Sequence, residues 1–344
     1  MTETPTARAA ASDTPSPAGA SAPKAAQAAP ARQRGAGLRD LSKWADWAAL
    51  VGLVLLVIVF QSLNSTFLSS GNIQSMLVAA AILIVLGIGQ TFVVATSGID
   101  LSVASTMTLS AVVFGMVFVG GLGLPLAIVA AVVSGAVIGL ANGLLVARGR
   151  ITDFIVTLGT LSAASGLALI LSDGKPATII SAPLLKLSTG SVGILGYSVI
   201  VALVLAVIAH VVLFHTRFGT HVLATGGNVE AANATGVRTA RVKTGVYVIS
   251  GVLAGVGAVL LVARVGAAEP AANTAFLLNS VAAVVLGGVS LFGGRATIIG
   301  PVIGALLLTA LVNGLTLLGV SQFYQPLSVG IVVVLAAFLT RFQK

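Results

Sequence analysis

A short polar stretch, Ala224 to Thr239, holds the residues of this chain that are best suited to a mechanical contact with a partner protein. It reads ATGGNVEAANATGVRT, in which Glu230-Ala231-Ala232 is followed by Gly236 in the pattern EAAxxxG. Asn228 is a good helix N-cap, an acidic first turn complements the helix dipole, and glycine ends helices readily. We therefore expect a short helix that begins near Val229 and presents a small alanine face to a cleft on a partner. The alternative is a connecting loop with no partner.

Three amide side chains stand in long apolar runs of the sequence. Gln90, Asn142 and Asn279 are neutral hydrogen-bonding groups that could line a path for a hydroxylated solute. Each could equally bond a neighbouring helix, which is the commoner role of such groups in membranes. No Asp or Glu falls at the middle of an apolar run, and this disfavours coupling to a proton or sodium gradient.

Several kinds of chemistry are excluded by what the sequence lacks. There is no Cys, and the three His residues lack the i, i+4 spacing of a helical metal site, so we expect no metal site. No catalytic constellation is present, and no phosphate-binding loop pattern occurs. Any energy from ATP must therefore come from another chain. The formal net charge of +9 reflects membrane topology rather than nucleic acid binding.

The composition is that of an integral membrane protein. Hydrophobic residues make up 57% of the chain and charged residues 8%, with a mean hydropathy of +1.09. A soluble domain has roughly a quarter charged residues. Residues 1–43 are rich in Ala, Pro, Ser and Thr, and we expect a disordered tail there. Residues 44–344 are expected to form the transmembrane domain, with a cytoplasmic loop at about 216–243.

The apolar runs predict an all-α polytopic protein with about ten transmembrane helices. Their expected bounds are 47–63, 74–96, 101–120, 124–147, 154–172, 197–215, 243–263, 275–292, 297–317 and 325–340. With both termini in the cytoplasm, this topology places every Lys and Arg on the inner side except Lys175, Lys186 and Arg264. That asymmetry is what the positive-inside rule requires.

Glycines recur at helical spacing within three of these runs, as Gly135-Gly139-Gly143, Gly251-Gly255 and Gly300-Gly304. Small residues at this spacing let helix backbones approach closely in a membrane. We expect tight packing within the bundle, and the alternative is a sliding surface for a moving helix.

Longer blocks of the sequence resemble the membrane permeases of bacterial ABC importers for sugars, the ribose-type group. They are GQTFVVATSGIDLSVAS, NGLLVARGRITDFIVTLGTLSAASGLA and AAVVLGGVSLFGGRATIIGPVIGALLL, which start at Gly89, Asn142 and Ala282. The EAAxxxG pattern is similar to the coupling-loop motif of ABC importer permeases. The resemblance covers about residues 67–338.

The resemblance implies particular roles for residues in these blocks. The coupling loop would place Asn228, Glu230, Ala231, Ala232 and Gly236 against an ATPase. The remaining signature residues are expected to be scaffold or gate elements rather than sugar ligands: Gly98, Asp100, Ser102, Gly287, Gly288, Gly293 and Gly294. Asp100 and Ser102 are expected to cap the N–H groups of a new helix at a cytoplasmic turn, and the glycines to allow tight backbone geometry.

The expected function is therefore the permease subunit of an importer for a monosaccharide, in the bacterial inner membrane. The resemblance implies three protein partners: an ABC ATPase, an extracytoplasmic sugar-binding protein and a second copy of this chain. ATP and Mg²⁺ would bind the ATPase, and this chain would bind no cofactor. The alternative is a self-contained secondary carrier or channel for a small polar solute.

Overall fold

The structure is a computed structural model that describes residues 41–271 and 274–340, which are mostly helical. The predicted tail, residues 1–43, lies outside the described residues except for its last three. The helices are α1 (Leu41–Leu63), α2 (Ser70–Ala95), α3 (Val103–Val119), α4 (Leu124–Ala147), α5 (Asp153–Ser172), α6 (Ala182–Thr189), α7 (Tyr197–His215), α8 (Arg217–Gly227), α9 (Val229–Ala234), α10 (Thr239–Val265), α11 (Thr274–Leu286), α12 (Ile299–Leu317) and α13 (Gln325–Thr340). Two antiparallel pairs of two-residue strands complete the described chain: β1 (Ala177–Thr178) with β4 (Ala267–Ala268), and β2 (Ser191–Val192) with β3 (Leu195–Gly196).

The predicted membrane segments are confirmed as helices. Each of the ten predicted runs coincides with one helix, and α4, α7 and α13 have the expected bounds. Six helices are long and apolar enough to cross a membrane, namely α2, α4, α5, α7, α10 and α12. The chain is therefore an all-α multi-pass membrane protein. The number of crossings and the side of each terminus stay predictions.

Two of the expected bounds are wrong by six residues: α1 begins at Leu41 rather than at residue 47, and one later run ends early. The run 275–292 was expected to be one span, but α11 ends at Leu286 and is 13 residues long. The chain turns there because Gly288 has a φ of +75°, which a helix does not allow. The helix α8 was not expected as a separate element. Thr216 caps it by accepting a hydrogen bond from the N–H of Gly219.

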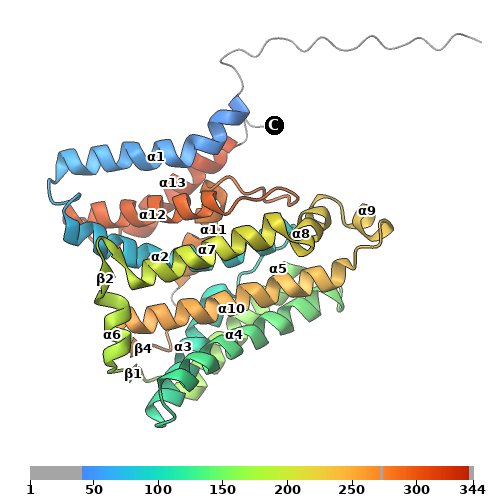
Figure 1. The fold of residues 1–344 in the computed structure, drawn as a ribbon, viewed down its shortest axis with the longest axis horizontal. Helices are drawn as coiled ribbons and strands as arrows, with labels where there is room; N and C mark the ends of the chain where they lie inside the picture. The colour runs from blue at the N-terminus through green and yellow to red at the C-terminus, as the bar shows by residue number, and fades with distance from the viewer. Residues whose placement is uncertain (1–40, 272–273, 341–344) are drawn as a thin grey trace, which may run out of the picture. The chain divides into compact units, whose positions relative to one another are not determined.

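The helical bundle has two ends with different contents. Figure 1 shows α8 and α9 at one end, and α6 with β1, β2 and β4 at the other. We call them the α9 end and the α6 end. Pairing of β1 with β4 joins the segments that follow α5 and α10, which fixes both segments at the α6 end. The helices α2 and α10 lie at the centre and are buried over most of their lengths.

The antiparallel helices α4 and α10 cross with their backbones in direct contact. A side chain at Gly135 would collide with the carbonyl of Gly251, and one at Gly139 would collide with the carbonyl of Tyr247. A Cβ at Gly143 would lie 2.7 Å from the Cα of Thr244. The predicted tight packing of these glycines is thus confirmed. The same holds at Gly300 and Gly304, which meet the backbone of α11 and the turn after it.

Replacing Gly139 by Ala is expected to destabilise the protein by about 2 kcal/mol, because overpacking at a backbone contact forces the helices apart. The measurement is the thermal midpoint of the detergent-purified chain. Gly330→Ala on α13 is the matched control, because no atom lies within 4 Å of the Cβ position at Gly330. Equal thermal midpoints for the two variants would contradict the close backbone contact between α4 and α10.

Candidate functional site

The turn between α2 and α3, residues 96–102, folds back into the bundle instead of lying on its surface. The side-chain amide of Gln90 donates to the carbonyl oxygen of Asp100 at 2.6 Å. Gln90 precedes the end of α2 by five residues, so this contact lies roughly 7 Å inside the helix end. Ser97 makes the reversal possible with a φ of +60°, an uncommon conformation for a residue other than glycine.

The carboxylate of Asp100 is the acceptor at the centre of this turn, and the residue is only 3% exposed. Its Oδ1 atom accepts from the backbone N–H and the hydroxyl of Ser102, at 2.9 and 2.6 Å. Its Oδ2 atom accepts from the hydroxyl of Ser250 on α10, at 2.8 Å. Burial raises the pKa of the Asp100 carboxyl above its usual value, and the hydrogen bonds from Ser102 and Ser250 oppose that rise.

The hydrogen bonds continue from Asp100 to two further helices. The amide of Asn142 on α4 donates to the Ser102 hydroxyl at 2.8 Å, and Thr160 on α5 donates to the Asn142 amide oxygen at 2.6 Å. We call Gln90, Asp100, Ser102, Asn142, Thr160 and Ser250 the Asp100 network. Its members come from α2, α4, α5, α10 and the turn before α3, so the hydrogen bonds around one buried aspartate connect five segments.

The backbone on either side of Asp100 is held as well. The hydroxyl of Tyr247 on α10 lies 3.1 Å from the carbonyl oxygen of Ile99 and 3.4 Å from a carboxylate oxygen of Asp153. A tyrosine hydroxyl has one proton, so it donates to one of these acceptors at a time. Tyr247 therefore joins the turn to the start of α5.

The outer part of the same turn meets two other segments at the α9 end. The hydroxyl of Ser97 lies 2.7 Å from the carbonyl oxygen of Phe292 and 3.0 Å from that of Gly226, the penultimate residue of α8. The N–H of Gly294 donates to the carbonyl of Ala95 at 3.1 Å. We call these five residues the Ser97 junction. It connects the end of α2, the end of α8 and the loop that follows α11.

Glycines allow this junction to form. A side chain at Gly226 would collide with the Ala95 carbonyl, and one at Gly293 would collide with the Ser97 hydroxyl. Gly293 and Gly294 have φ values of +77° and +74°. The predicted tight backbone geometry of Gly287, Gly288, Gly293 and Gly294 is confirmed, since Gly287 also packs on the backbone of Gly300. Gly98 is similarly confined, because a Cβ there would lie 3.0 Å from Asp153 and Val93.

The predicted short helix is present as α9. The side chain of Asn228 accepts from the N–H of Ala231 at 2.9 Å, and Gly236 ends the helix with a φ of +88°. Glu230 and Ala231 are exposed, whereas Ala232 is buried. The helix thus has its expected bounds and cap. Its contact with a partner remains a prediction.

The expected capping role of Ser102 is wrong. Ser102 precedes α3, but its side chain caps no N–H group of that helix. Its hydroxyl donates to Asp100 instead, and Asp100 accepts the N–H of Ser102 itself. The physical reason is burial, because a carboxylate that is shielded from water needs hydrogen-bond donors from the protein.

Two of the three amides predicted to line a path lie together. Gln90 and Asn142 both belong to the Asp100 network, whereas Asn279 lies on α11 and is half-buried. The Oε1 atom of Gln90 is buried and has no hydrogen-bond partner among the described residues. Their role toward a solute stays a prediction.

Sequence reasoning missed Ser97 and Ser250 as part of this site. Ser250 lies next to Gly251, at the crossing with α4, so a hydroxyl beside a close-contact glycine was the available signal. For Ser97 the signal was weaker, since nothing in the sequence places it beside Gly226 or Phe292. Only the fold brings these distant residues together.

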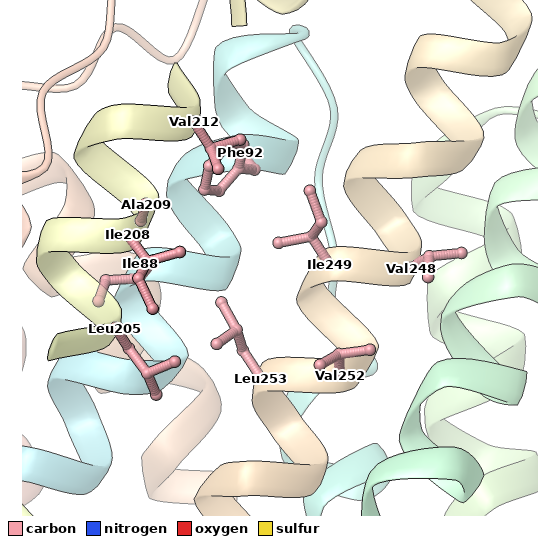
Figure 2. Close-up of a pocket in the computed structure, with 10 residues that line it drawn as sticks. All are labelled: Ile88, Phe92, Leu205, Ile208, Ala209, Val212, Val248, Ile249, Val252 and Leu253. Atoms are coloured by element: carbon pink, nitrogen blue, oxygen red, sulfur yellow. The ribbon is translucent and has the colours of Figure 1, made fainter. Parts of the chain in front are cut away.

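A cavity of about 200 Å³ lies apart from the network, between α2, α7 and α10 (Figure 2). Its ten lining residues are all apolar, among them Phe92, Ile208 and Ile249. Such a wall offers no hydrogen-bonding side chain for a hydroxylated solute.

A family model and several named proteins match most of the chain. Residues 72–337 match the family model described as the branched-chain amino acid transport system permease component. The chain is 41% identical to the ribose import permease protein of Bacillus subtilis strain 168, covering 85% of this chain and 91% of the relative. It is 35% identical to the L-arabinose ABC transporter permease of Azospirillum brasilense, with 92% of each chain covered. It is 33% identical to the D-allose transport system permease of Escherichia coli K12, covering 87% and 92%. No solved structure matches the chain.

Replacing Asp100 by Ala is expected to destabilise the fold by about 2 kcal/mol or more, because three donors lose their buried acceptor. Asp100→Asn keeps one carbonyl oxygen and should cost less. The measurement is again the thermal midpoint in detergent. Asp173→Ala is the control, because the Asp173 side chain is 87% exposed. A wild-type midpoint for Asp100→Ala would contradict the central role of this carboxylate.

Proposed function

The chain belongs to the family of branched-chain amino acid transport system permease components, and from this premise we propose that it is the membrane permease subunit of an ABC importer for a monosaccharide, ribose or a related sugar. The similarity to named ribose, arabinose and allose permeases over most of the chain carries the proposal. The subunit is a transporter component and not an enzyme. In these systems ATP hydrolysis belongs to a separate ATPase subunit, to which we assign ATP and Mg²⁺.

We assign the α9 end to the cytoplasm and the membrane to the bacterial inner membrane. Basic residues at the described helix ends and turns support this orientation. The α9 end carries Arg148, Arg150, Arg217, Arg238, Arg241, Lys243 and Arg295, whereas the α6 end carries Lys175, Lys186 and Arg264. Cytoplasmic loops are enriched in Lys and Arg. The α6 end would then face the extracytoplasmic sugar-binding protein.

In this proposal, α9 is the helix that docks on the ATPase. Glu230 and Ala231 are exposed there, and Asn228 and Gly236 set where the helix starts and stops. Because α8 and α9 are separated only by Asn228, a movement of α9 also moves the end of α8. Gly226 then carries that movement to Ser97 in the turn before Asp100. The ATPase would thereby shift the balance between outward and inward access, provided that it contacts the two states differently.

The importer would contain two copies of this chain, because each chain has one α9 and ABC machinery uses two nucleotide sites. The outer face of α5 supports contact with a second copy. Phe154, Ile155 and Leu158 are exposed on it, and no atom lies within 4 Å of a Cβ position at Gly159 or Gly166. Glycines with open space above them on a membrane helix leave room for close approach of another helix.

The first test is whether an ATPase co-purifies with the gently solubilised, tagged chain. Glu230→Ala and Gly236→Leu should weaken the association, the first by removing an exposed contact and the second by straining a residue with positive φ. Glu269→Ala, an exposed acidic change at the α6 end, is the control and should bind normally. Light scattering of the complex should give two copies of the chain.

The opposite results would be equally informative. If no ATPase associates in detergent or in native membranes, the importer assignment fails. Sugar uptake by the purified chain alone, without nucleotide, would support a secondary carrier or channel instead. If a complex that transports sugar contains a single copy of this chain, the proposal of two copies is wrong.

Ser97→Ala tests the proposed connection between α9 and the buried turn. The variant should still bind the ATPase but lower ATP-dependent sugar uptake by about fivefold or more, within the usual range of coupling energies. The measurement is uptake into proteoliposomes with the ATPase and the sugar-binding protein present. Ser188→Ala on α6 removes a comparable side-chain hydrogen bond and is the control. Unchanged uptake by Ser97→Ala would show that the Ser97 junction does not carry the movement.

A further inference from the structure

The apolar cavity between α2, α7 and α10 is a groove at the surface of the bundle. Both α7 and α10 pack against α2, which forms its floor. Figure 2 shows Ile208 and Ala209 of α7 on one side of the gap and Ile249 and Leu253 of α10 on the other. The lining of α7 runs from Leu205 to Val212, a length of about 10 Å along the helix.

The groove is continuous with the surface that faces lipid. Next to its lining, α7 exposes Val204, Val207 and Val211, whose exposed fractions are 52%, 63% and 46%. In a membrane these side chains contact acyl chains, so the cavity beside them opens to hydrocarbon and not to water. A void of this kind in a bilayer is filled by hydrocarbon, since its walls offer only dispersion contacts.

Two arginines flank the end of the groove that lies toward α9. The ring of Phe218 on α8 approaches α10 at Gly245, where a Cβ would be 3.1 Å from it. Arg217 precedes that phenylalanine. On α10, Arg241, Gly245 and Val248 follow each other at i, i+4 and i+7, so Arg241 lies on the groove face one turn beyond Gly245.

Both guanidinium groups are available for an anion. Arg217 and Arg241 are exposed, and neither has a carboxylate partner within 4 Å among the described residues. An arginine fork matches a phosphate group in geometry and charge. An apolar groove that ends at two free arginines therefore complements a molecule with a hydrocarbon chain and a phosphate at its end.

We propose that this groove binds one anionic phospholipid, with an acyl chain between α7 and α10 and the headgroup phosphate at Arg217 and Arg241. Basic sites between membrane helices on the cytoplasmic side are suited to anionic headgroups. The lipid fills the gap that α7 and α10 leave above α2. It also holds α7 and the start of α8 in place, just before the segment that continues into α9.

The test uses native mass spectrometry of the full chain, delipidated in detergent and then supplied with equal amounts of phosphatidylglycerol and phosphatidylcholine. The wild type is expected to retain one phosphatidylglycerol per chain in preference to phosphatidylcholine. Ala209→Phe places a ring in the groove and should abolish this retention. Each of Arg217→Gln and Arg241→Gln should lower the preference for phosphatidylglycerol by about fivefold, which corresponds to one lost cation near a headgroup.

Matched controls separate the groove from general effects. Val207→Phe adds the same ring two residues away on the exposed face of α7, and Arg264→Gln removes a cation from the other end of α10. Both should retain lipid as the wild type does. Equal retention of the two lipids by the wild type, or full retention by Ala209→Phe, would overturn the proposal. The arginine variants leave the packing intact, so they test it even where Ala209→Phe folds poorly.

Discussion

The burial of one carboxylate inside an apolar bundle is the constraint on which the rest of this structure depends. Asp100 is far from water, so its oxygens need hydrogen-bond donors from the protein. Ser102 and Ser250 supply them, and Asn142 and Thr160 fix Ser102 in turn. The helices α4, α5 and α10 are thereby held around the turn after α2, although α10 is distant from it in sequence.

The glycine contacts between α4 and α10 serve the same constraint. Asn142 is adjacent to Gly143, and Ser250 is adjacent to Gly251, so each polar side chain stands beside a close-contact glycine. With larger residues at the crossing the two helices would separate, and their polar groups would no longer reach the Asp100 turn together. Close backbone packing at the glycines and hydrogen bonding of the buried polar side chains therefore depend on each other in this protein. Little hydrophobic force draws helices together in lipid. The dispersion contacts at the glycines and the hydrogen bonds of the Asp100 network therefore hold α4 and α10 in place.

Much of this arrangement could be predicted from the sequence, because membrane helices and caps depend on local composition. The helices α4, α7 and α13 have the expected bounds, and so does α9 with the Asn228 cap and the Gly236 stop. The end of α11 was misplaced because its apolar run continues through Gly287 and Gly288, and hydropathy does not register a backbone turn. The contacts of the Ser97 junction could not be predicted, because apart from the Ser97 hydroxyl they are made by carbonyl groups and glycines that carry no distinctive side chain.

The composition of the Ser97 junction also explains how the α9 end can act as a unit. Gly226, Gly293 and Gly294 pack directly against Ala95 and Ser97, and a side chain at Gly226 or Gly293 would collide with them, so these segments have little room to move independently. A displacement of α8 must therefore either move the turn 96–102 or break the junction. Moving that turn also moves Asp100, which accepts hydrogen bonds from Gln90 on α2, from Ser250 on α10 and from Ser102 in the same turn. In the proposed importer, a small shift at the surface helix would therefore select between two packings of the bundle interior, because a close-packed interior does not deform continuously.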